Sequence, residues 1–357
     1  MPVASIPASQ PFLDTLAAGL AALGEQDADP LALPRVTVLL PTRRSCRALR
    51  EALLRARAGR AALLPRIVPL GDLDEEDGPG LDTLALPSPL PALTRQLMLT
   101  RLILARGEDM TPAQATRLAV DLARLLDQAH TEEIDIAAIA ALPVKEELAH
   151  HWQVTLDFLG LLIDVWPPLL QEWGAVDPAL HRSLGLKAQA QAWRERPPAG
   201  RIIAAGSTGS IPAAADVLKV VADLPHGLVI LPGLDTSLDD ASWEALEDTH
   251  PQAALKRLLD RFGLTRAQVG SCEAFLPPLV PPTPLSPAQD ARARLVTLAL
   301  RPAATTEAWR HLGESGDTLC SCRCWPLTPP SHGRAFSWAW SACRWATPRA
   351  PWPSGVI

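Results

Sequence analysis

The amino-acid sequence predicts an α/β protein in which a large helical insertion interrupts a parallel sheet. Residues 202–231 form the pattern apolar strand, Gly/Ser/Thr turn, helix, apolar strand, and residues 3–40 repeat the order strand, helix, strand. Strand–helix–strand units of this length join parallel strands of one sheet. A third observation, the almost wholly helical stretch between residues 89 and 200, predicts the insertion.

Composition bounds the class of protein. With 357 residues the chain can form more than one domain, and its net charge of -6 excludes a wholly basic nucleic-acid coat but permits a local basic patch. No apolar run reaches the length of a membrane span, and the first residues show no signal-peptide pattern. Only two cysteines, Cys46 and Cys272, precede residue 318, which suits a reducing compartment. We therefore expect a cytoplasmic protein without a membrane partner.

The first elements are a strand at residues 3–6, a helix at 11–23 and a strand at 36–40. The loop SIPASQP (residues 5–11) stands where nucleotide-dependent motors hold phosphate groups. Such a loop needs glycines, so that backbone N–H groups can face the phosphate oxygens, and a lysine. This loop has neither, and its prolines cannot donate a hydrogen bond. It is therefore predicted to be a degenerate phosphate loop.

The most basic stretch covers the strand at 36–40 and the helix after it. It contains a single acidic residue, Glu51, against eight arginines: Arg35, Arg43, Arg44, Arg47, Arg50, Arg55, Arg57 and Arg60. Pro41-Thr42-Arg43-Arg44 lies where the strand ends and the helix begins, and such a junction suits a nucleic-acid phosphate. The alternative is a solvated arginine face above Leu49 and Leu53, which is what most charge runs are.

The insertion follows an acidic, turn-rich loop at residues 71–80, which lacks the ordered ligand spacing of a calcium loop. Thr111 to Gln114 reads as an N-cap, a proline at N1 and a capping-box glutamine. A helix from about residue 146 is expected to end at Pro167-Pro168, and Asp177-Pro178 is expected to begin the next. Three histidines of the insertion lie near one another in the sequence and are expected at the surface, because a zinc site would need spaced ligands and a further partner; they are His130, His150 and His151.

The sheet resumes with strands at residues 202–205 and 228–231. Their carboxyl ends carry Gly206-Ser207-Thr208 and Gly233-Leu234-Asp235, and this end of a parallel sheet is where ligands bind. An amphipathic helix follows at residues 250–259 and ends at Gly263. A proline-rich connector at 271–287 leads to a last helix at about 288–300.

The segment from about residue 318 onward differs from the rest. It has no acidic residue, five of the chain's eleven tryptophans and four of its six cysteines, namely Cys320, Cys322, Cys324 and Cys343. The C-x-C-x-C spacing is a poor match to zinc and iron–sulfur sites, and so many tryptophans would be a liability in an exposed tail. A shifted reading frame in GC-rich DNA explains the composition best, so no metal site and no catalytic residue is assigned here.

The chain resembles the N-terminal part of AddB, the double-strand break repair subunit of the AddAB helicase–nuclease, in its alphaproteobacterial form. The resemblance runs in order from about residue 3 to about residue 310 and rests on four motifs: VTVLLPTRR (36–44), AAGSTGSIP (204–212), LPGLD (231–235) and HPQ (250–252). It implies a superfamily 1 helicase-like core, divided into residues 1–88, an inserted helical subdomain at 89–200 and a continuation at 201–270. A connector with a helix at 271–317 and the aberrant tail at 318–357 complete the division.

The resemblance further implies a heterodimer with an AddA-type subunit, which supplies the ATP- and Mg²⁺-dependent motor, on single- and double-stranded DNA in the nucleoid. A C-terminal nuclease domain, with Mg²⁺ and in some members an iron–sulfur cluster, would lie beyond residue 357. Thr42 and Arg43 fall on the motif that touches the DNA backbone, and the neighbouring Arg44 and Arg47 extend this candidate set. Five positions fall on the degenerate nucleotide site: Ser9, Gln10, Gly206, Ser207 and Thr208. The missing lysine and carboxylate argue against ATP hydrolysis by this chain.

Two other functions remain open at this point. The first is an α/β enzyme or nucleotide binder that uses the turn at residues 206–210 to hold a phosphate, although this turn fits neither G-x-S-x-G nor G-x-G-x-x-G. The second is a fragment without activity, truncated by the shifted frame.

Overall fold

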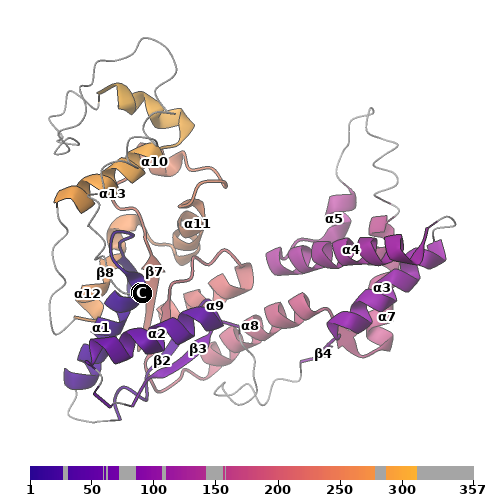
Figure 1. Cartoon of the computed structure of the whole chain (residues 1–357), viewed down its shortest axis with the longest axis horizontal. Coiled ribbons are helices and arrows are strands. Elements are labelled where there is room, and N and C mark those ends of the chain that lie inside the picture. The colour runs from indigo at the N-terminus through magenta and orange to yellow at the C-terminus, as the bar shows by residue number, and fades with distance from the viewer. Residues whose placement is uncertain are drawn as a thin grey trace, which may run out of the picture. The chain divides into compact units, whose positions relative to one another are not determined.

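The structure, a computed structural model, describes residues 1–26, 31–58, 60–61, 63–71, 86–106, 110–141, 156, 158–277 and 287–311. Residues Met1–His311 belong to one compact unit. Its centre is a six-stranded sheet of order β3-β2-β6-β7-β1-β8, and every neighbouring pair is parallel (Figure 1). The strands are β1 (Val3–Ile6), β2 (Thr37–Leu40), β3 (Arg66–Pro69), β6 (Ile202–Ala205), β7 (Gly227–Pro232) and β8 (Gly270–Ser271). The predicted α/β class with a parallel sheet is confirmed.

Helices cover both faces of this sheet because successive strand residues point to opposite sides. Val38 and Leu40 pack with α1 (Phe12–Gln26), α2 (Arg43–Ala56) and α12 (Cys272–Phe275) in one apolar cluster. Leu39 belongs to the opposite cluster, with α8 (Pro178–Glu195), α9 (Pro212–Asp223), α10 (Asp240–Glu244) and α11 (Ala253–Phe262). Burial on both faces explains why β1, β6 and β7 are almost wholly apolar, with Ser5 as the polar exception in β1.

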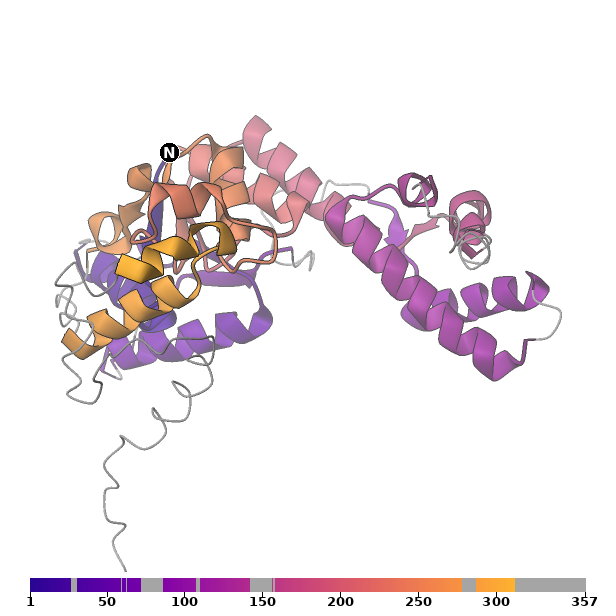
Figure 2. The same ribbon diagram turned by 90° about the horizontal axis from the view of Figure 1, so that it is seen from above.

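The segment between β3 and β6 is mainly helical and has an apolar cluster of its own. It comprises α3 (Ala92–Arg106), α4 (Pro112–Glu132), α5 (Ile136–Ala140), the π-helical turn η3 (Leu161–Val165), α7 (Trp166–Glu172) and α8. Helices α3 and α4 pack against each other (Figure 2). A short parallel pair, β4 (Ser88–Pro89) with β5 (Ala175–Val176), joins its two ends. The N-terminal half of α8 contacts α4 and its C-terminal half, with Leu186 and Trp193, contributes to the cluster on the sheet.

Two expectations about this segment need correction. The expected helix end at Pro167-Pro168 is wrong, because both prolines lie in the first turn of α7. The π-helical turn η3 leads directly into α7, since the Trp166 backbone N–H donates to the Leu161 carbonyl, so the helical path continues past the prolines. His130 is also not a surface residue, since 24% of its side chain is exposed and its ring contacts the buried Asp177.

Other boundaries follow the expected signals. Thr111 caps α4 with a full capping box to Gln114, and Pro212 begins α9 at N1. The last helices are α13 (Pro287–Ala299) and the 3-10 helix η5 (Ala303–His311). His150, His151, most of the acidic loop (72–80) and the tail at 318–357 lie outside the described residues, so what was expected of them stays a prediction. Within the described part of the chain, no helix combines the length and apolarity needed to cross a bilayer.

Candidate functional site

At two points along the carboxyl edge of the sheet, two neighbouring strands are followed by helices that lie on opposite faces of the sheet. Strand β2 leads to α2 on one face, while its neighbour β6 leads to α9 on the other; β7 leads to α10 and α11, while its neighbour β1 leads to α1. Ligands of open parallel sheets bind at such topological switch points, because the diverging loops leave room between them. The β2–β6 switch point and the β7–β1 switch point are therefore the candidate sites.

Thr42 organises the β2–β6 switch point by capping α2. Its hydroxyl oxygen accepts the backbone N–H of Ser45 at 3.1 Å, and the Ser45 hydroxyl accepts the backbone N–H of Thr42 at 3.1 Å. This box satisfies two N–H groups that a helix start leaves unpaired. It fixes the direction in which the first turn of α2 leaves the sheet, and the Thr42 side chain acts here as a helix cap.

The arginines predicted to bind DNA lie on the first two turns of α2. Arg43, Arg44 and Arg47 are exposed, while Cys46 and Leu49 on the other side of the helix are buried. Among the described residues, Arg44 and Arg47 form no ion pair or hydrogen bond of their side chains. The result is an exposed positive surface at the carboxyl edge of the sheet, which we call the α2 arginine surface: Arg43, Arg44 and Arg47.

The turn at residues 206–210 lies beside the start of α2. Gly206 has a φ of 77°, and a β-carbon added there would stand 3.7 Å from Cδ of Pro41 and 3.1 Å from the ring of Phe12. The turn also closes on itself, because the Ser207 hydroxyl accepts the backbone N–H of Gly209 at 3.3 Å. The structure thus brings this turn and the Pro41–Arg44 motif together at one switch point.

The β7–β1 switch point contains a cavity of about 610 Å³. Ser9 and Gln10 line it from the β1–α1 loop, Gly233 to Leu238 line it from the loop after β7, and α13 lines it from the other side. The cavity does not include Gly206, Ser207 or Thr208, because β7 separates β6 from β1 in the sheet. The five positions of the degenerate nucleotide site are therefore distributed over two switch points.

Gln252 fixes the loop after β7. Its side-chain oxygen accepts the backbone N–H of Asp235 at 3.1 Å, and its amide nitrogen donates to the Gly233 carbonyl at 3.0 Å. The Gln252 backbone N–H donates to Nδ1 of His250 at 3.0 Å, so Nε2 of that ring carries the hydrogen and donates to the Leu300 carbonyl at 2.7 Å. The HPQ motif therefore holds the loop on one side and the end of α13 on the other.

Asp235 is hydrogen-bonded at both carboxylate oxygens. Oδ1 accepts from the Ser237 N–H, the Ser237 hydroxyl and the Leu238 N–H, and Oδ2 accepts from the Thr297 hydroxyl at 2.6 Å. Partial burial acts to raise the pKa of this carboxyl, but the hydrogen bonds, with that from Thr297 the strongest, outweigh burial and keep the pKa below its ordinary value. A carboxylate so occupied ties α13 to the loop after β7.

A buried charged network lies in the helical insertion. Asp177 is 1% exposed; its Oδ2 accepts the Trp166 indole N–H at 2.9 Å and lies 3.3 Å from Nε2 of His130. Its Oδ1 lies 2.7 Å from Nε of Arg95, an ion pair without hydrogen-bond alignment, since neither atom has a hydrogen-bond partner. Burial acts to raise the pKa of Asp177, and the contacts with His130, Arg95 and Trp166 lower it on balance. The network borders an apolar cavity of about 360 Å³ and joins α3, α4, α7 and the start of α8.

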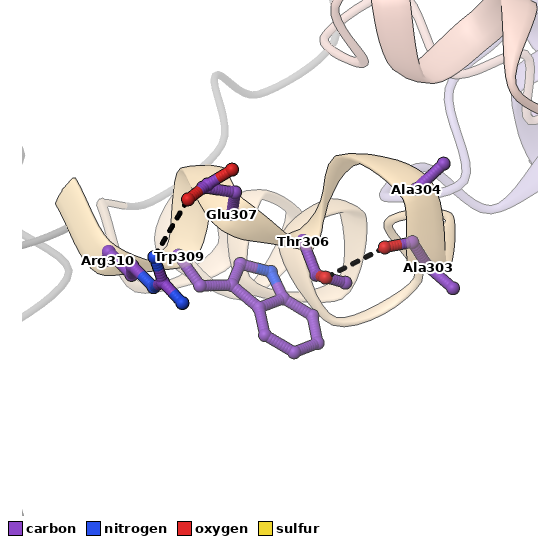
Figure 3. Close-up of a pocket in the computed structure, with 6 residues that line it drawn as sticks. All are labelled: Ala303, Ala304, Thr306, Glu307, Trp309 and Arg310. Atoms are coloured by element: carbon purple, nitrogen blue, oxygen red, sulfur yellow. Dashed lines mark hydrogen bonds and ion pairs between the residues drawn. The ribbon is translucent and has the colours of Figure 1, made fainter.

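A third hollow lies along η5 (Figure 3). Its polar side chains already have partners: Arg310 pairs with Glu307 at 2.8 Å, the Thr306 hydroxyl donates to the Ala303 carbonyl at 2.8 Å, and the Trp309 indole N–H donates to the Leu298 carbonyl of α13 at 2.9 Å. The hollow is open to solvent and offers no convergent polar groups. It has no features of a catalytic site.

Sequence reasoning located the α2 arginine surface but missed the contribution of α13 to the second site. The helix itself was expected, but no local pattern indicates that Thr297 meets a carboxylate 62 residues away. Among the described residues, no group of three or more His, Cys, Asp or Glu side chains is arranged to hold a metal ion. No protein-family model matches the chain, and no curated protein matches it significantly.

Proposed function

We propose that the chain is the non-catalytic, helicase-like DNA-binding portion of an AddB-type subunit, which acts with an AddA-type motor in the resection of double-strand breaks. The α2 arginine surface carries this proposal. Guanidinium groups at a helix start, above the carboxyl edge of a parallel sheet, suit the phosphates of a single strand. Because Arg44 and Arg47 form no ion pair with any other described residue, binding DNA would not require breaking one there.

The β1–α1 loop supports a non-catalytic role for this chain. Ser9 and Gln10 offer one hydroxyl and one amide, and Pro7 and Pro11 offer no N–H group. A phosphate-holding loop instead presents a series of backbone N–H groups and a lysine. The ATP-driven step and its Mg²⁺ would belong to the partner.

The decisive experiment compares single-stranded DNA binding of the full chain with that of the double variant Arg43→Glu/Arg44→Glu over a range of salt concentrations. Each lost phosphate contact should reduce the slope of log K against log salt by about 0.7, so two lost contacts should reduce it by about 1.4. We expect weaker binding and this smaller slope in the variant.

The matched control is Arg117→Glu/Arg124→Glu, which makes the same charge change on the exposed side of α4. Circular dichroism should show that both variants fold. Equal affinity and equal salt dependence in the wild type and the α2 variant would remove the α2 arginine surface from the interface. An equal loss in both variants would show that net charge, rather than this surface, governs binding.

A further inference from the structure

The cavity at the β7–β1 switch point contains polar side chains that the fold does not use. Asp235, Gln252 and His250 are occupied by the contacts described above. Ser9, Gln10 and Arg292 also line the cavity, and their side chains have no hydrogen bond or ion pair among the described residues. These three groups are therefore available to a ligand.

The available charge in the cavity is positive. Asp290 also lines it, but its carboxylate pairs with Nε of Arg294 at 3.2 Å, one turn further along α13. Asp235 accepts hydrogen bonds at both oxygens, so neither carboxylate needs a cation. Within the part of the chain that the structure describes, Arg292 is the lining residue whose charge has no counterion, and a guanidinium is well matched to a carboxylate or a phosphate.

Beyond Thr297 and the polar residues at its start, such as Gln289, α13 lines the cavity with apolar residues that are open to the solvent. Val296 is 51% exposed and Leu300 is 42% exposed, and Ala293 lies between Arg292 and Val296 on the same wall. On the opposite wall, Pro7 and Ala8 precede Ser9 and Gln10. A flat or apolar body placed between these walls would remove Val296 and Leu300 from water.

The cavity has the size and place of a ligand site. About 610 Å³ falls within the roughly 300–1,000 Å³ of small-molecule pockets. It lies where the chain leaves β1 and β7 towards opposite faces of the sheet, which is the general position of ligands in open α/β sheets. The volume of the cavity, its position in the sheet and its unused polar side chains are therefore all those of a ligand site.

We propose that this cavity binds a small organic anion: a carboxylate or phosphate that pairs with Arg292, attached to a flat or apolar body that packs against Val296 and Leu300. The side chains of Ser9 and Gln10 hydrogen-bond the polar edge of that body. The site is separate from the α2 arginine surface, so the proposal does not depend on DNA binding. A bound anion would bridge the β1–α1 loop and α13 and hold α13 more firmly against the sheet.

The test is isothermal titration calorimetry on the full chain with four probes: adenosine monophosphate, adenosine, indole-3-carboxylate and inorganic phosphate. We expect one or both of the flat anions to bind and the uncharged adenosine to bind about tenfold more weakly, since a charged hydrogen-bonded pair is lost. Binding of the monophosphate alone identifies a phosphate ligand, and binding of indole-3-carboxylate alone identifies a carboxylate ligand. Inorganic phosphate should bind weakly because it has no body to pack.

The variants Arg292→Gln and Arg194→Gln separate the site from general charge, because Arg194 is exposed on α8 and does not line the cavity. Arg292→Gln should weaken binding of the anion about tenfold, whereas Arg194→Gln should not, and Arg292→Gln should leave single-stranded DNA affinity unchanged. A thermal unfolding curve confirms that both variants fold. Absence of binding by both flat anions at millimolar concentration, or equal weakening by the two variants, would overturn the proposal.

Discussion

The hydroxyl of Thr297 donates a hydrogen bond to Asp235 at 2.6 Å and thereby joins α13 to the loop after β7. Further contacts follow along the same segment: His250 with the Leu300 carbonyl, Asp239 with Arg301, and Ser242 with Thr305. Together they attach residues 297–305 to the part of the chain that leaves the carboxyl edge of the sheet.

Replacement of Thr297 by Val should loosen this attachment. The change keeps the shape of the side chain but removes the donor to a charged acceptor, and we expect a loss of roughly 1–2 kcal/mol in the free energy of unfolding. Urea denaturation measures it. Thr306→Val is the control, because its hydroxyl bonds only within η5, and it should cost less.

Asp235→Asn should reduce stability in a pH-dependent way. The pKa of Asp235 is lowered in the folded state, so its contribution is present above the ordinary value of 3.8 and is lost as the pH falls below that value. The difference in unfolding free energy between wild type and variant should therefore be largest at neutral pH and shrink on acidification. A difference that stayed constant through this range would show that the carboxylate charge plays no part.

Arg95→Met should be strongly destabilising, because it leaves Asp177 buried without its guanidinium partner. Breaking one side of a buried ion pair costs roughly 3–5 kcal/mol. Chemical denaturation should show this loss, whereas the exposed Arg101→Met on the same helix should change stability by less than about 0.5 kcal/mol. The double variant Arg95→Met/Asp177→Asn should recover part of the loss; no recovery would mean that packing, and not the unpaired charge, is responsible.

Two glycines with positive φ should respond differently to alanine. Gly263 ends α11 with a φ of 69° and has no atom within 4 Å of an added β-carbon, so Gly263→Ala should cost about 1 kcal/mol from backbone strain alone. Gly233 has a φ of 64°, and its added β-carbon would lie 3.2 Å from Cβ of Ala8. Gly233→Ala should therefore cost more unfolding free energy than Gly263→Ala. Equal losses of unfolding free energy in urea denaturation would show that contact with Ala8 adds nothing to the backbone strain.

Cys272 should resist alkylation in the native protein. It is 3% exposed, and burial, with a smaller effect of Glu273, raises its pKa to about 11, so very little thiolate forms at neutral pH. Peptide mass spectrometry after a short exposure to iodoacetamide should find Cys272 unmodified, and labelling should become complete in denaturant. Rapid native labelling would show that α12 opens readily.

Elements with a strong local pattern were predictable. Continuous apolar runs placed β1 and β6 at their observed bounds, and a capping box and an N1 proline placed the starts of α4 and α9. The strand–helix junction at Pro41–Arg44 was also predicted, but the role of Thr42 as the cap of α2 was not.

Short elements that depend on pairing were not predictable. β3 contains an arginine and a proline, and β8 has two residues; each is a strand because it pairs with β2 or β1 at an edge of the sheet. The contribution of α13 to the β7–β1 site was missed for a related reason. Its last wall, α13, is brought there by contacts across about sixty residues, and the polarity of a single helix does not indicate its partner.

The order of strands has a consequence for synthesis on the ribosome. β1 is made first, but its partner β7 follows about 226 residues later, as the Ser5–Leu231 contact shows. At a synthesis rate of roughly 5–20 residues per second, about ten to fifty seconds pass between the synthesis of the segment VASI and that of its partner strand β7. During that interval the helical insertion can complete its own apolar cluster from contacts within residues 90–170, while the sheet cannot close. Nascent chains released before β7 emerges should therefore hold protease-resistant helices next to an unprotected N-terminus.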